Sequence, residues 1–256
     1  MAGGDLLQKA GDLFEKEPRL IRLPSRGKVI FVGDTHGDLD ATEEITRQYL
    51  KEPCRVVFLG DYVDRGRYSA ENILHLLRLK VEHPDDIYLL AGNHEGYSTK
   101  QFFPADFWDS LSTEERESFG RLFEKLPLAA AAENGVLALH GGLPDLPGLE
   151  DVNGIAWGDD SWSRIVWGDF VEQPGEVLGE WGGRLQLGEQ YFSRLMQRYR
   201  KRLLIRSHQP DSPRQMFDRR CITIFTSRAY VPTRTVVLVD LEKEVCTAAD
   251  VTIYTI

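Results

Sequence analysis

Cysteine is scarce in this sequence, which has only three among its 256 residues: Cys54, Cys221 and Cys246. They are widely separated, odd in number and form no Cys-x-x-Cys pair, which argues against a disulfide framework and against a thiolate metal site. Isolated cysteines of this kind usually act as small buried apolar side chains. The cysteine usage therefore predicts a protein of a reducing compartment, and we expect a cytoplasmic location.

Long apolar runs are missing as well. Crossing a bilayer takes about 20 consecutive apolar residues, and no stretch of the chain approaches that. The N-terminal segment MAGGDLLQKAGDLFEKEPRL has no basic start, no continuous apolar core and no small-residue cleavage site, so we do not expect a signal peptide. The sequence predicts a soluble protein with no membrane partner.

Positive charge is outweighed by negative charge, with 31 Lys and Arg against 40 Asp and Glu and a net charge of −9. An acidic surface repels nucleic acid and anionic membranes, so we expect no nucleic-acid partner. Two bound divalent cations would still create a strongly positive site in such a protein. The charge balance thus leaves room for an anionic substrate at a metal centre.

Apolar residues in the first half follow an alternating pattern of strands and helices. Residues 1–26 are predicted to form a helical extension, whose amphipathic helix ends at Pro18. After it, runs rich in β-branched and aromatic residues alternate with amphipathic segments; strands are predicted at 28–33, 55–60 and 87–92, and helices at 39–50 and 70–80. Asp40 and Glu43 have capping-box-like spacing in the first of these helices. This order predicts parallel β-α-β units.

The second half has a different pattern. Residues 143–183, rich in Gly, Asp, Trp and Pro, are predicted to be long loops with one or two short helices. Around them we expect helices at 102–123 and 191–200, and strands at 135–140, 202–207, 221–226, 234–240 and 251–256. The last strands are expected to form an antiparallel or mixed sheet. With no linker or repeat, residues 1–256 are predicted to be a single α/β domain.

Five of the predicted strands end in polar motifs: GDTHG (33–37), GDYVDRG (60–66), GNHE (92–95), HGG (140–142) and RSH (206–208). Ligands of open α/β sheets bind at the carboxyl ends of the strands, so these motifs should converge on one crevice. They supply Asp, Asn and His donors and no thiolate, a set that suits two divalent ions such as Mn, Fe or Zn.

A single motif of this kind would carry little weight. A lone Gly-Asp after a strand is usually a turn, and a lone buried His is usually part of a hydrogen-bonded core. His75 and His83, in a helix and at its exit, are predicted to be structural. The other four histidines all lie at strand ends: His36, His94, His140 and His208. Five strand ends of the same character favour a functional site.

The motifs GDTHG, GDYVDRG, GNHE and HGG, in this order, resemble the signature of the phosphoprotein phosphatase family of Ser/Thr phosphatases, within the calcineurin-like metallophosphoesterases. The resemblance extends to IRSHQ (205–209) and TIFTSRAY (223–230), so it covers nearly all of the chain from residue 28. It implies an α/β fold with a central β-sandwich of two mixed sheets flanked by helices. It also implies two divalent metal ions, with manganese expected in vitro and iron or zinc as alternatives, and a phosphorylated protein or peptide as substrate. A monomer is the default expectation.

The resemblance also implies a role for each matching residue. One ion would be bound by Asp34, His36 and Asp61, and the second by Asp61, Asn93, His140 and His208, so that Asp61 bridges the two. Arg65 and Asn93 would bind the phosphate, and Tyr230 would lie at the rim of the site. His94 would protonate the leaving oxygen and would be oriented by Asp64, which makes His94, Asp64 and Arg65 the catalytic set.

The sequence departs from the family pattern in three places. A second phosphate-binding arginine is expected, and Arg184 matches it best, although the chain is shortened just after it; Arg164 is the alternative. Arg228 lies where the family has Ala-Pro-Asn, and it is either a solvated loop residue or a charge that faces the substrate. The chain ends soon after its last predicted strand, so we expect no regulatory tail.

Two other functions stay open. The first is hydrolysis of nucleotide polyphosphates, as by a diadenosine tetraphosphatase, or of phosphodiesters by an enzyme of the same superfamily. Such enzymes tend to have Ala-Arg-Gly where this chain has Asp64-Arg65-Gly66, and GNHD in place of GNHE. The second is a non-catalytic scaffold, which nothing favours because every ligand, the acid and its carboxylate are present. The predicted function is metal-dependent hydrolysis of phosphoserine and phosphothreonine in proteins.

Overall fold

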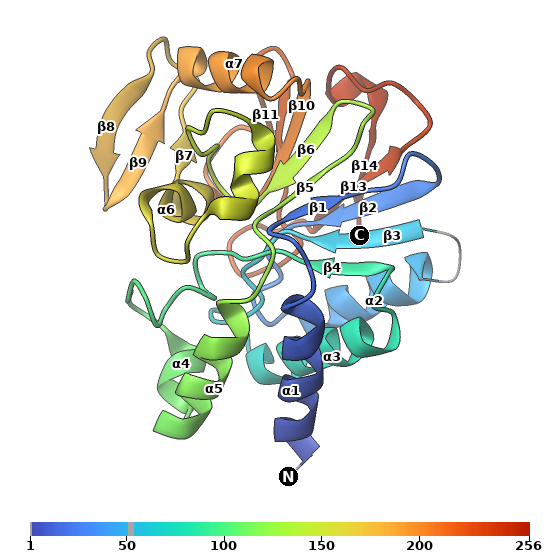
Figure 1. Cartoon of the computed structure of the whole chain (residues 1–256), viewed down its shortest axis with the longest axis vertical. Helices are drawn as coiled ribbons and strands as arrows, with labels where there is room; N and C mark the ends of the chain where they lie inside the picture. The colour runs from blue at the N-terminus through green and yellow to red at the C-terminus, as the bar shows by residue number, and fades with distance from the viewer. Residues whose placement is uncertain (1, 51–53) are drawn as a thin grey trace.

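Two large mixed sheets form the centre of the computed structural model, which describes residues 2–50 and 54–256 (Figure 1). The five-stranded sheet has the order β14 (Thr252–Thr255), β13 (Thr235–Asp240), β2 (Lys28–Val32), β3 (Cys54–Phe58), β4 (Ile87–Leu89). The six-stranded sheet has the order β1 (Leu20–Arg22), β5 (Ala129–Ala131), β6 (Val136–Leu139), β10 (Leu203–Arg206), β12 (Cys221–Thr223), β11 (Gln215–Met216). The α/β fold with two mixed sheets and flanking helices, expected from the sequence, is confirmed.

Alternate residues of the strands face two different cores. In β2, Val29 and Phe31 belong to a cluster made of side chains from both large sheets and from no α-helix. Ile30 and Val32 belong to the larger cluster, which also includes the helices. Because both faces of the sheet are buried, the strand reads as one continuous apolar run rather than as an alternating pattern.

The predicted β-α-β units are confirmed. Strands β2, β3 and β4 pair in parallel and are connected by α2 (Leu39–Tyr49) and α3 (Ser69–Glu82). The predicted capping pair of Asp40 and Glu43 is wrong, because the N-cap of α2 is Asp38, whose carboxylate accepts a hydrogen bond from the Ala41 amide. Asp38 directly precedes the first helical residue, so its side chain can reach the free amides of the first turn.

The first 26 residues contain a strand in addition to the predicted helix. Helix α1 (Ala2–Phe14) packs against α3 and α5 (Thr113–Phe123), and β1 then pairs in parallel with β5 at the edge of the six-stranded sheet. Behind α1, the buried ammonium of Lys80 donates to Glu17 at 2.5 Å and to the carbonyl of Ile87 at 2.8 Å. The N-terminal segment is therefore joined to both the helical layer and the sheet.

Of two predictions for the middle of the chain, the first is wrong, and the second gave the short helices but not the strands. Residues 102–123 do not form one helix: α4 (Asp106–Ser110) is followed by α5, which begins with a capping box of Ser112 and Glu115. Residues 143–183 contain the helical segments η1 (Leu149–Gly154) and α6 (Asp160–Trp167), and they also supply two strands of a third sheet.

This third sheet is small and lies beside the large ones (Figure 1). Its order is β7 (Asp169–Phe170), β9 (Arg184–Leu187), β8 (Val177–Trp181). All five residues of β8 are exposed, so the segment has no alternating apolar pattern from which a strand could be predicted.

The predicted C-terminal strands do not form one sheet. After α7 (Glu189–Arg198), β10 and β12 pair in parallel within the six-stranded sheet. Strands β13 and β14 instead extend the five-stranded sheet, where β13 is antiparallel to β2. The sequence predicted the strands, but their division between sheets depends on long-range pairing.

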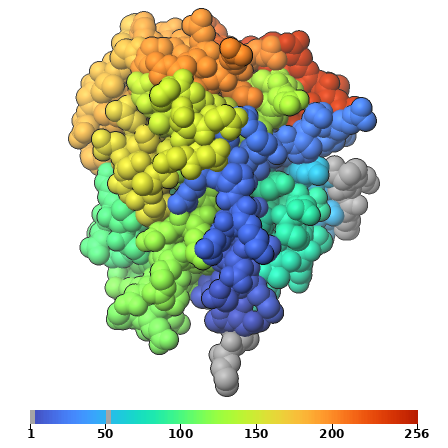
Figure 2. Space-filling model, viewed as in Figure 1, coloured from blue at the N-terminus to red at the C-terminus, as the bar shows by residue number. Residues whose placement is uncertain are grey.

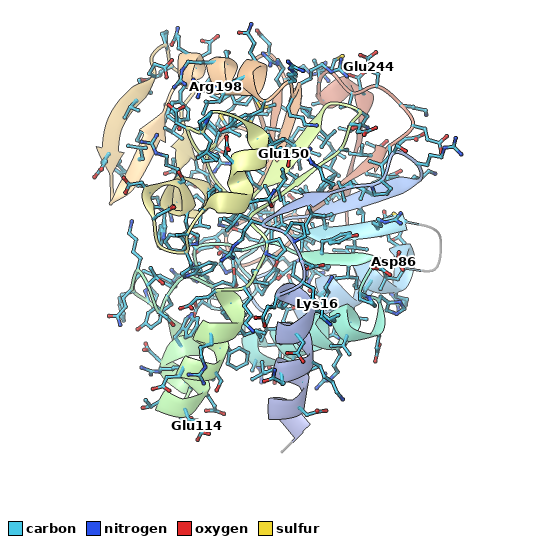
Figure 3. The ribbon with its side chains drawn as sticks, viewed as in Figure 1. Lys16, Asp86, Glu114, Glu150, Arg198 and Glu244 are labelled. Carbon is cyan, nitrogen blue, oxygen red and sulfur yellow. The ribbon has the colours of Figure 1, made fainter. Side chains whose placement is uncertain are left out.

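The space-filling view shows the N-terminal segment, in dark blue, at the surface of the molecule (Figure 2). Figure 3 shows Lys16, Glu114, Glu150, Arg198 and Glu244 around the outside of the molecule, and all five are exposed. Of the free cysteines, two are buried and one is exposed. Over residues 2–50 and 54–256, none of the helices has the length and apolarity needed to cross a membrane.

Candidate active site

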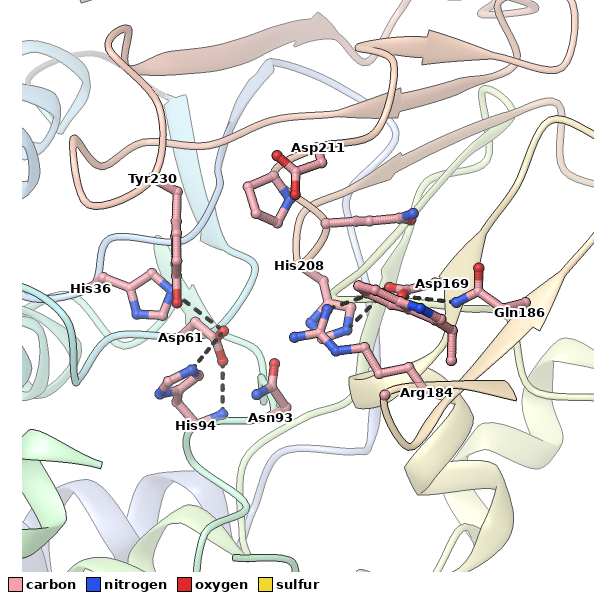
Figure 4. A pocket seen from close by; sticks show the side chains of 14 residues that line it. His36, Asp61, Asn93, His94, Asp169, Arg184, Gln186, His208, Asp211 and Tyr230 are labelled. Atoms are coloured by element: carbon pink, nitrogen blue, oxygen red, sulfur yellow. Dashed lines mark hydrogen bonds and ion pairs between the residues drawn. The ribbon is translucent and has the colours of Figure 1, made fainter. Parts of the chain in front are cut away.

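The polar strand ends of both large sheets meet at one place, as the sequence predicted. A cavity of about 310 Å³ opens there (Figure 4). Its lining includes five of the predicted site residues from the strand-end motifs: His36, Asp61, Asn93, His94 and His208. Asp34 and His140 are buried next to them, with 3.6 Å between the Asp34 Oδ1 and His140 Nδ1 atoms.

The first group of potential metal ligands surrounds the His36 imidazole. Its Nε2 atom lies 3.7 Å from Oδ2 of Asp34 and 3.6 Å from Oδ2 of Asp61. Its Nδ1 atom lies 2.9 Å from the carbonyl of Val63, to which it can donate a proton. That hydrogen bond would leave the lone pair on Nε2, the atom that faces the two carboxylates. His94 also lies within reach of this group, with Nε2 3.9 Å from Oδ2 of Asp61.

The second group surrounds the Nε2 atom of His140. This atom lies 3.1 Å from Asn93 Oδ1, 3.1 Å from His208 Nδ1 and 3.5 Å from Asp61 Oδ2. The Nδ1 atom of His140 faces the carbonyl of Leu59 at 2.9 Å. Atoms bound to one ion at about 2.1 Å are themselves about 3 Å apart, so this spacing fits a shared cation. Asp61 belongs to both groups.

Burial shifts the pKa of every ionisable ligand toward its neutral form. It raises the pKa of Asp34 to about 7 and that of Asp61 well above its ordinary value. It lowers the pKa of His36 to about 3 and those of His140 and His208 well below the ordinary range. Divalent cations would stabilise the carboxylates and would bind the neutral imidazoles, so the donor set fits two such ions.

The backbone of the site is strained. Five of its non-glycine residues have positive φ angles, between 42° and 74°: His36, Asp61, Asp64, Arg65 and His208. Such conformations cost on the order of 1–3 kcal/mol each and persist where the surrounding structure imposes them.

Glu95, which the sequence reading did not assign a role, holds part of this strained backbone. Its buried carboxylate accepts hydrogen bonds from the amides of Asp61 at 2.8 Å, Tyr62 at 2.9 Å and Gly92 at 2.9 Å. A Cβ atom at Gly92 would overlap with Oδ1 of Asp61, so only glycine leaves that carboxylate its place. In the sequence, the glutamate that ends the GNHE motif was the feature that could have indicated this role.

His94 and Asp64 are in contact within the site. The two side chains meet at 2.7 Å between Nδ1 and Oδ2, and the other Asp64 oxygen accepts from the Phe107 amide at 2.7 Å. Burial raises the pKa of Asp64 to about 6. Burial, followed by the charges of Arg65 and Arg184, lowers the pKa of His94 well below its ordinary value. The pair is therefore sensitive to any negative charge that enters the cavity.

Residues 27–212 match the family model described as calcineurin-like phosphoesterase. This chain belongs to that family. The phosphoesterase is 30% identical over 228 residues to a probable serine/threonine-protein phosphatase of Encephalitozoon cuniculi, covering 82% of this chain and 49% of that protein. It is 28% identical over 242 residues to serine/threonine-protein phosphatase T of Saccharomyces cerevisiae, covering 88% of this chain and 47% of that protein. The chain thus spans about half the length of these two relatives.

A solved structure extends the likeness to nearly the whole phosphoesterase. It is a protein serine/threonine phosphatase of Saccharomyces cerevisiae, described as similar to a human phosphatase. The TM-score is 0.84 at 26% identity, over 98% of this chain and 88% of that chain. The fold therefore agrees with the family.

The structure separates the two candidate arginines of the phosphoesterase. Arg184 lines the cavity, and its guanidinium lies 3.6 Å from Oδ1 of Asp169 and 5.8 Å from the centre of the Trp167 ring. Arg164 is absent from the cavity lining and instead donates to the hydroxyl of Tyr191 at 3.0 Å. The first choice from the sequence, Arg184, is the one that reaches the site.

The other residues predicted near the rim differ in whether they line the cavity. Tyr230 lines the cavity, with its ring centre 5.3 Å from that of His36. Arg65 is half-buried and is not part of the cavity wall; its charge lowers the pKa of Tyr230 against the larger raising effect of burial. Arg228 is exposed, lies outside the wall, and its amide donates to Asp38, which supports its interpretation as a loop residue.

Asp169 is a site residue that the sequence reading missed. It is buried in the cavity wall, 3.5 Å from Nε2 of His208, and it accepts a hydrogen bond from Gln186 at 3.1 Å. It also lies near Arg184, so it can orient both a potential metal ligand and a cavity arginine. In the sequence, Asp169 ends the second of two Trp-Gly-Asp triplets, 157–159 and 167–169, which are too isolated to indicate a role.

Proposed function

We propose that this phosphoesterase hydrolyses phosphate monoesters of phosphoserine and phosphothreonine in proteins. The observation that carries the proposal is the pairing of His94 with Asp64 beside two groups of metal ligands that share Asp61. Phosphatase relatives of about 30% identity support the same reaction and substrate. Residues 1–256 would act as one catalytic domain, with residues 1–26 as its extension.

We assign one divalent ion to Asp34, His36 and Asp61, and the other to Asp61, Asn93, His140 and His208. When bound, two such ions neutralise phosphate charge and lower the pKa of a bound water to about 7. Asp34 is assigned to the first ion because its Oδ2 atom lies 3.7 Å from Nε2 of His36, and His94 is assigned to proton transfer. Manganese in vitro, a cytoplasmic location and a monomeric state remain predictions.

His94 would act as the general acid. A serine or threonine alkoxide is a poor leaving group, so a positioned proton donor contributes about 10²–10⁴-fold. With Nδ1 of His94 donating to Asp64, the Nε2 atom faces the cavity and would carry the transferable proton once the imidazole is protonated. A phosphate dianion beside the imidazole would raise the pKa of His94 and so counteract the effect of burial.

The remaining polar groups would bind and orient the phosphate. Arg184 presents a guanidinium in the cavity, and such a fork matches two phosphate oxygens. Asn93 lines the cavity as well and can donate through its amide nitrogen. Arg65 and Tyr230 would complete the phosphate site at the rim.

The proposal is tested by measuring which substrates are hydrolysed and whether hydrolysis depends on metal. Phosphoserine, phosphothreonine and phosphotyrosine peptides, a phosphodiester and diadenosine tetraphosphate are hydrolysed with Mn²⁺ or with a chelator. We expect metal-dependent release mainly from the phosphoserine and phosphothreonine peptides. Preference for the diester or the dinucleotide would overturn the proposal in favour of the nucleotide alternative, and turnover unaffected by chelation would overturn the metal assignment.

A further inference from the structure

One wall of the active-site cavity is the hairpin formed by β8 and β9. Trp181, Gly182, Arg184 and Gln186 of this hairpin line the cavity. The Trp181 side chain is 74% exposed, although tryptophan is usually well buried. A large apolar side chain left in solvent at the mouth of a site can bind a ligand.

The strand register places Trp181 on the same face as Arg184. The two residues are direct cross-strand partners, so their side chains project to the same side of the hairpin. Gly182 and Gly183, with φ angles of 58° and 75°, form the two-residue turn between them. Positive φ at both turn positions suits the twist of a hairpin, so this turn holds the indole and the guanidinium side by side.

The hairpin is held in place by contacts that do not involve Trp181. At the turn, the ammonium of Lys100 donates to the carbonyl of Gly183 at 3.1 Å. At the other end, Glu176, which directly precedes β8, pairs with Arg194 of α7 at 2.6 Å. The indole is therefore not needed to anchor the wall.

We propose that Trp181 forms a subsite for an apolar side chain that flanks the phosphorylated residue of the substrate. This inference rests on the proposed phosphatase function. Cross-strand partners have Cβ atoms about 5 Å apart, and residues of an extended peptide advance about 3.3 Å each. With the phosphate at Arg184, an apolar side chain one or two residues away in the peptide reaches the indole.

The experiment compares Trp181→Ala with the wild-type protein on three substrates. These are a phosphoserine peptide with leucine at the flanking positions, the same peptide with glycine there, and p-nitrophenyl phosphate. On the leucine peptide we expect kcat/KM to fall about 10-fold, mostly through KM, as when an apolar anchor of an interface is truncated. On the other two substrates we expect a change below about 2-fold, since neither reaches the subsite with an apolar group.

Two further variants separate the subsite from a general effect on the hairpin. Leu178→Ala removes another exposed apolar side chain of β8 that is not part of the cavity lining, and it should leave all three substrates unaffected. Trp181→Phe should restore most of the preference for the leucine peptide, because a planar apolar surface remains.

Four results would overturn the inference. An equal loss on all three substrates would mean that Trp181 acts through Arg184, and no loss on any would mean that the indole does not bind substrate. If wild-type protein cleaves p-nitrophenyl phosphate but neither peptide, the phosphatase function fails together with the subsite. If it cleaves both peptides equally well and Trp181→Ala preserves that equality, only the subsite fails.

Discussion

The metal-ligand groups and the β8–β9 hairpin are two walls of one cavity with opposite construction. The potential ligands are buried, and they come from the strand ends of both large sheets. The hairpin is exposed along the whole of β8, and side-chain contacts from Lys100 and Arg194 tether it. The comparison indicates that the geometry required for chemistry resides in the buried sheets, while contact with the substrate is left to a surface element that can vary.

The two regions also differ in the interactions that stabilise and destabilise them. Buried carboxylates and strained φ angles destabilise the ligand groups, and the close packing of two sheets offsets that cost. The hairpin contains little buried apolar surface and few strained residues other than glycine. Substitutions in the first region should therefore affect metal binding and turnover, and those in the second should affect recognition or stability only modestly.

Asp61→Asn should have the largest effect, because Asp61 belongs to both ligand groups. We expect loss of both ions and a fall in kcat of at least about 10³-fold, since two metals together supply several kcal/mol of transition-state stabilisation. Metal content per protein, measured by mass spectrometry, checks the first part. Asp64→Asn is the matched control and should retain both ions; two ions in Asp61→Asn would contradict the bridging assignment.

His94→Asn should reduce kcat on a phosphoserine peptide by about 10²–10⁴-fold while metal content stays unchanged. The loss should be much smaller with p-nitrophenyl phosphate, because nitrophenolate leaves without needing a proton. Steady-state kinetics on both substrates provide the measurement. If both substrates lose the same factor, His94 is not the proton donor.

Arg184→Ala should lower kcat/KM about 10–100-fold on every phosphate monoester, because a charged hydrogen-bond donor to the phosphate is removed. Arg164→Ala is the control, since Arg164 bonds Tyr191 outside the cavity. Its kinetics should match those of the wild-type protein, although its thermal stability should fall. The opposite pattern would exchange the roles of the two arginines.

Asp145→Asn should have the smallest effect, on stability alone. The hydrogen bond from Arg194 has the largest effect and lowers the pKa of Asp145; burial opposes it, and a hydrogen bond from Arg198 lowers the pKa further. Because the folded pKa lies below the unfolded one, the stabilisation is present above about pH 4 and is lost as the pH falls through the folded value. The variant should be less stable by about 0.5 kcal/mol at pH 7, a value that allows for its exposure. Urea unfolding at pH 7 and at low pH measures this difference, which should disappear in acid.

Most of the chemistry could be predicted from the sequence, because each ligand motif directly follows a buried apolar run. His36 follows β2 and His208 follows β10, so the local pattern alone places them at strand ends. The family motifs also implied a pairing of His94 with Asp64, whose side chains lie 2.7 Å apart in the structure. Local sequence is enough for these predictions, because a buried strand and the turn after it are encoded in adjacent residues.

The third sheet, the role of Asp169 and the orientation of Trp181 were decided only by the tertiary structure. Strand β8 has no buried face, so no periodic pattern marks it. Asp169 acquires its contacts from His208 and Gln186, which lie 39 and 17 residues away in the chain. Sequence by itself determined which residues end the buried strands, because burial leaves a periodic or continuous apolar signal. Only the folded chain decided which distant side chains meet, because strand pairing and register depend on contacts that no local pattern contains.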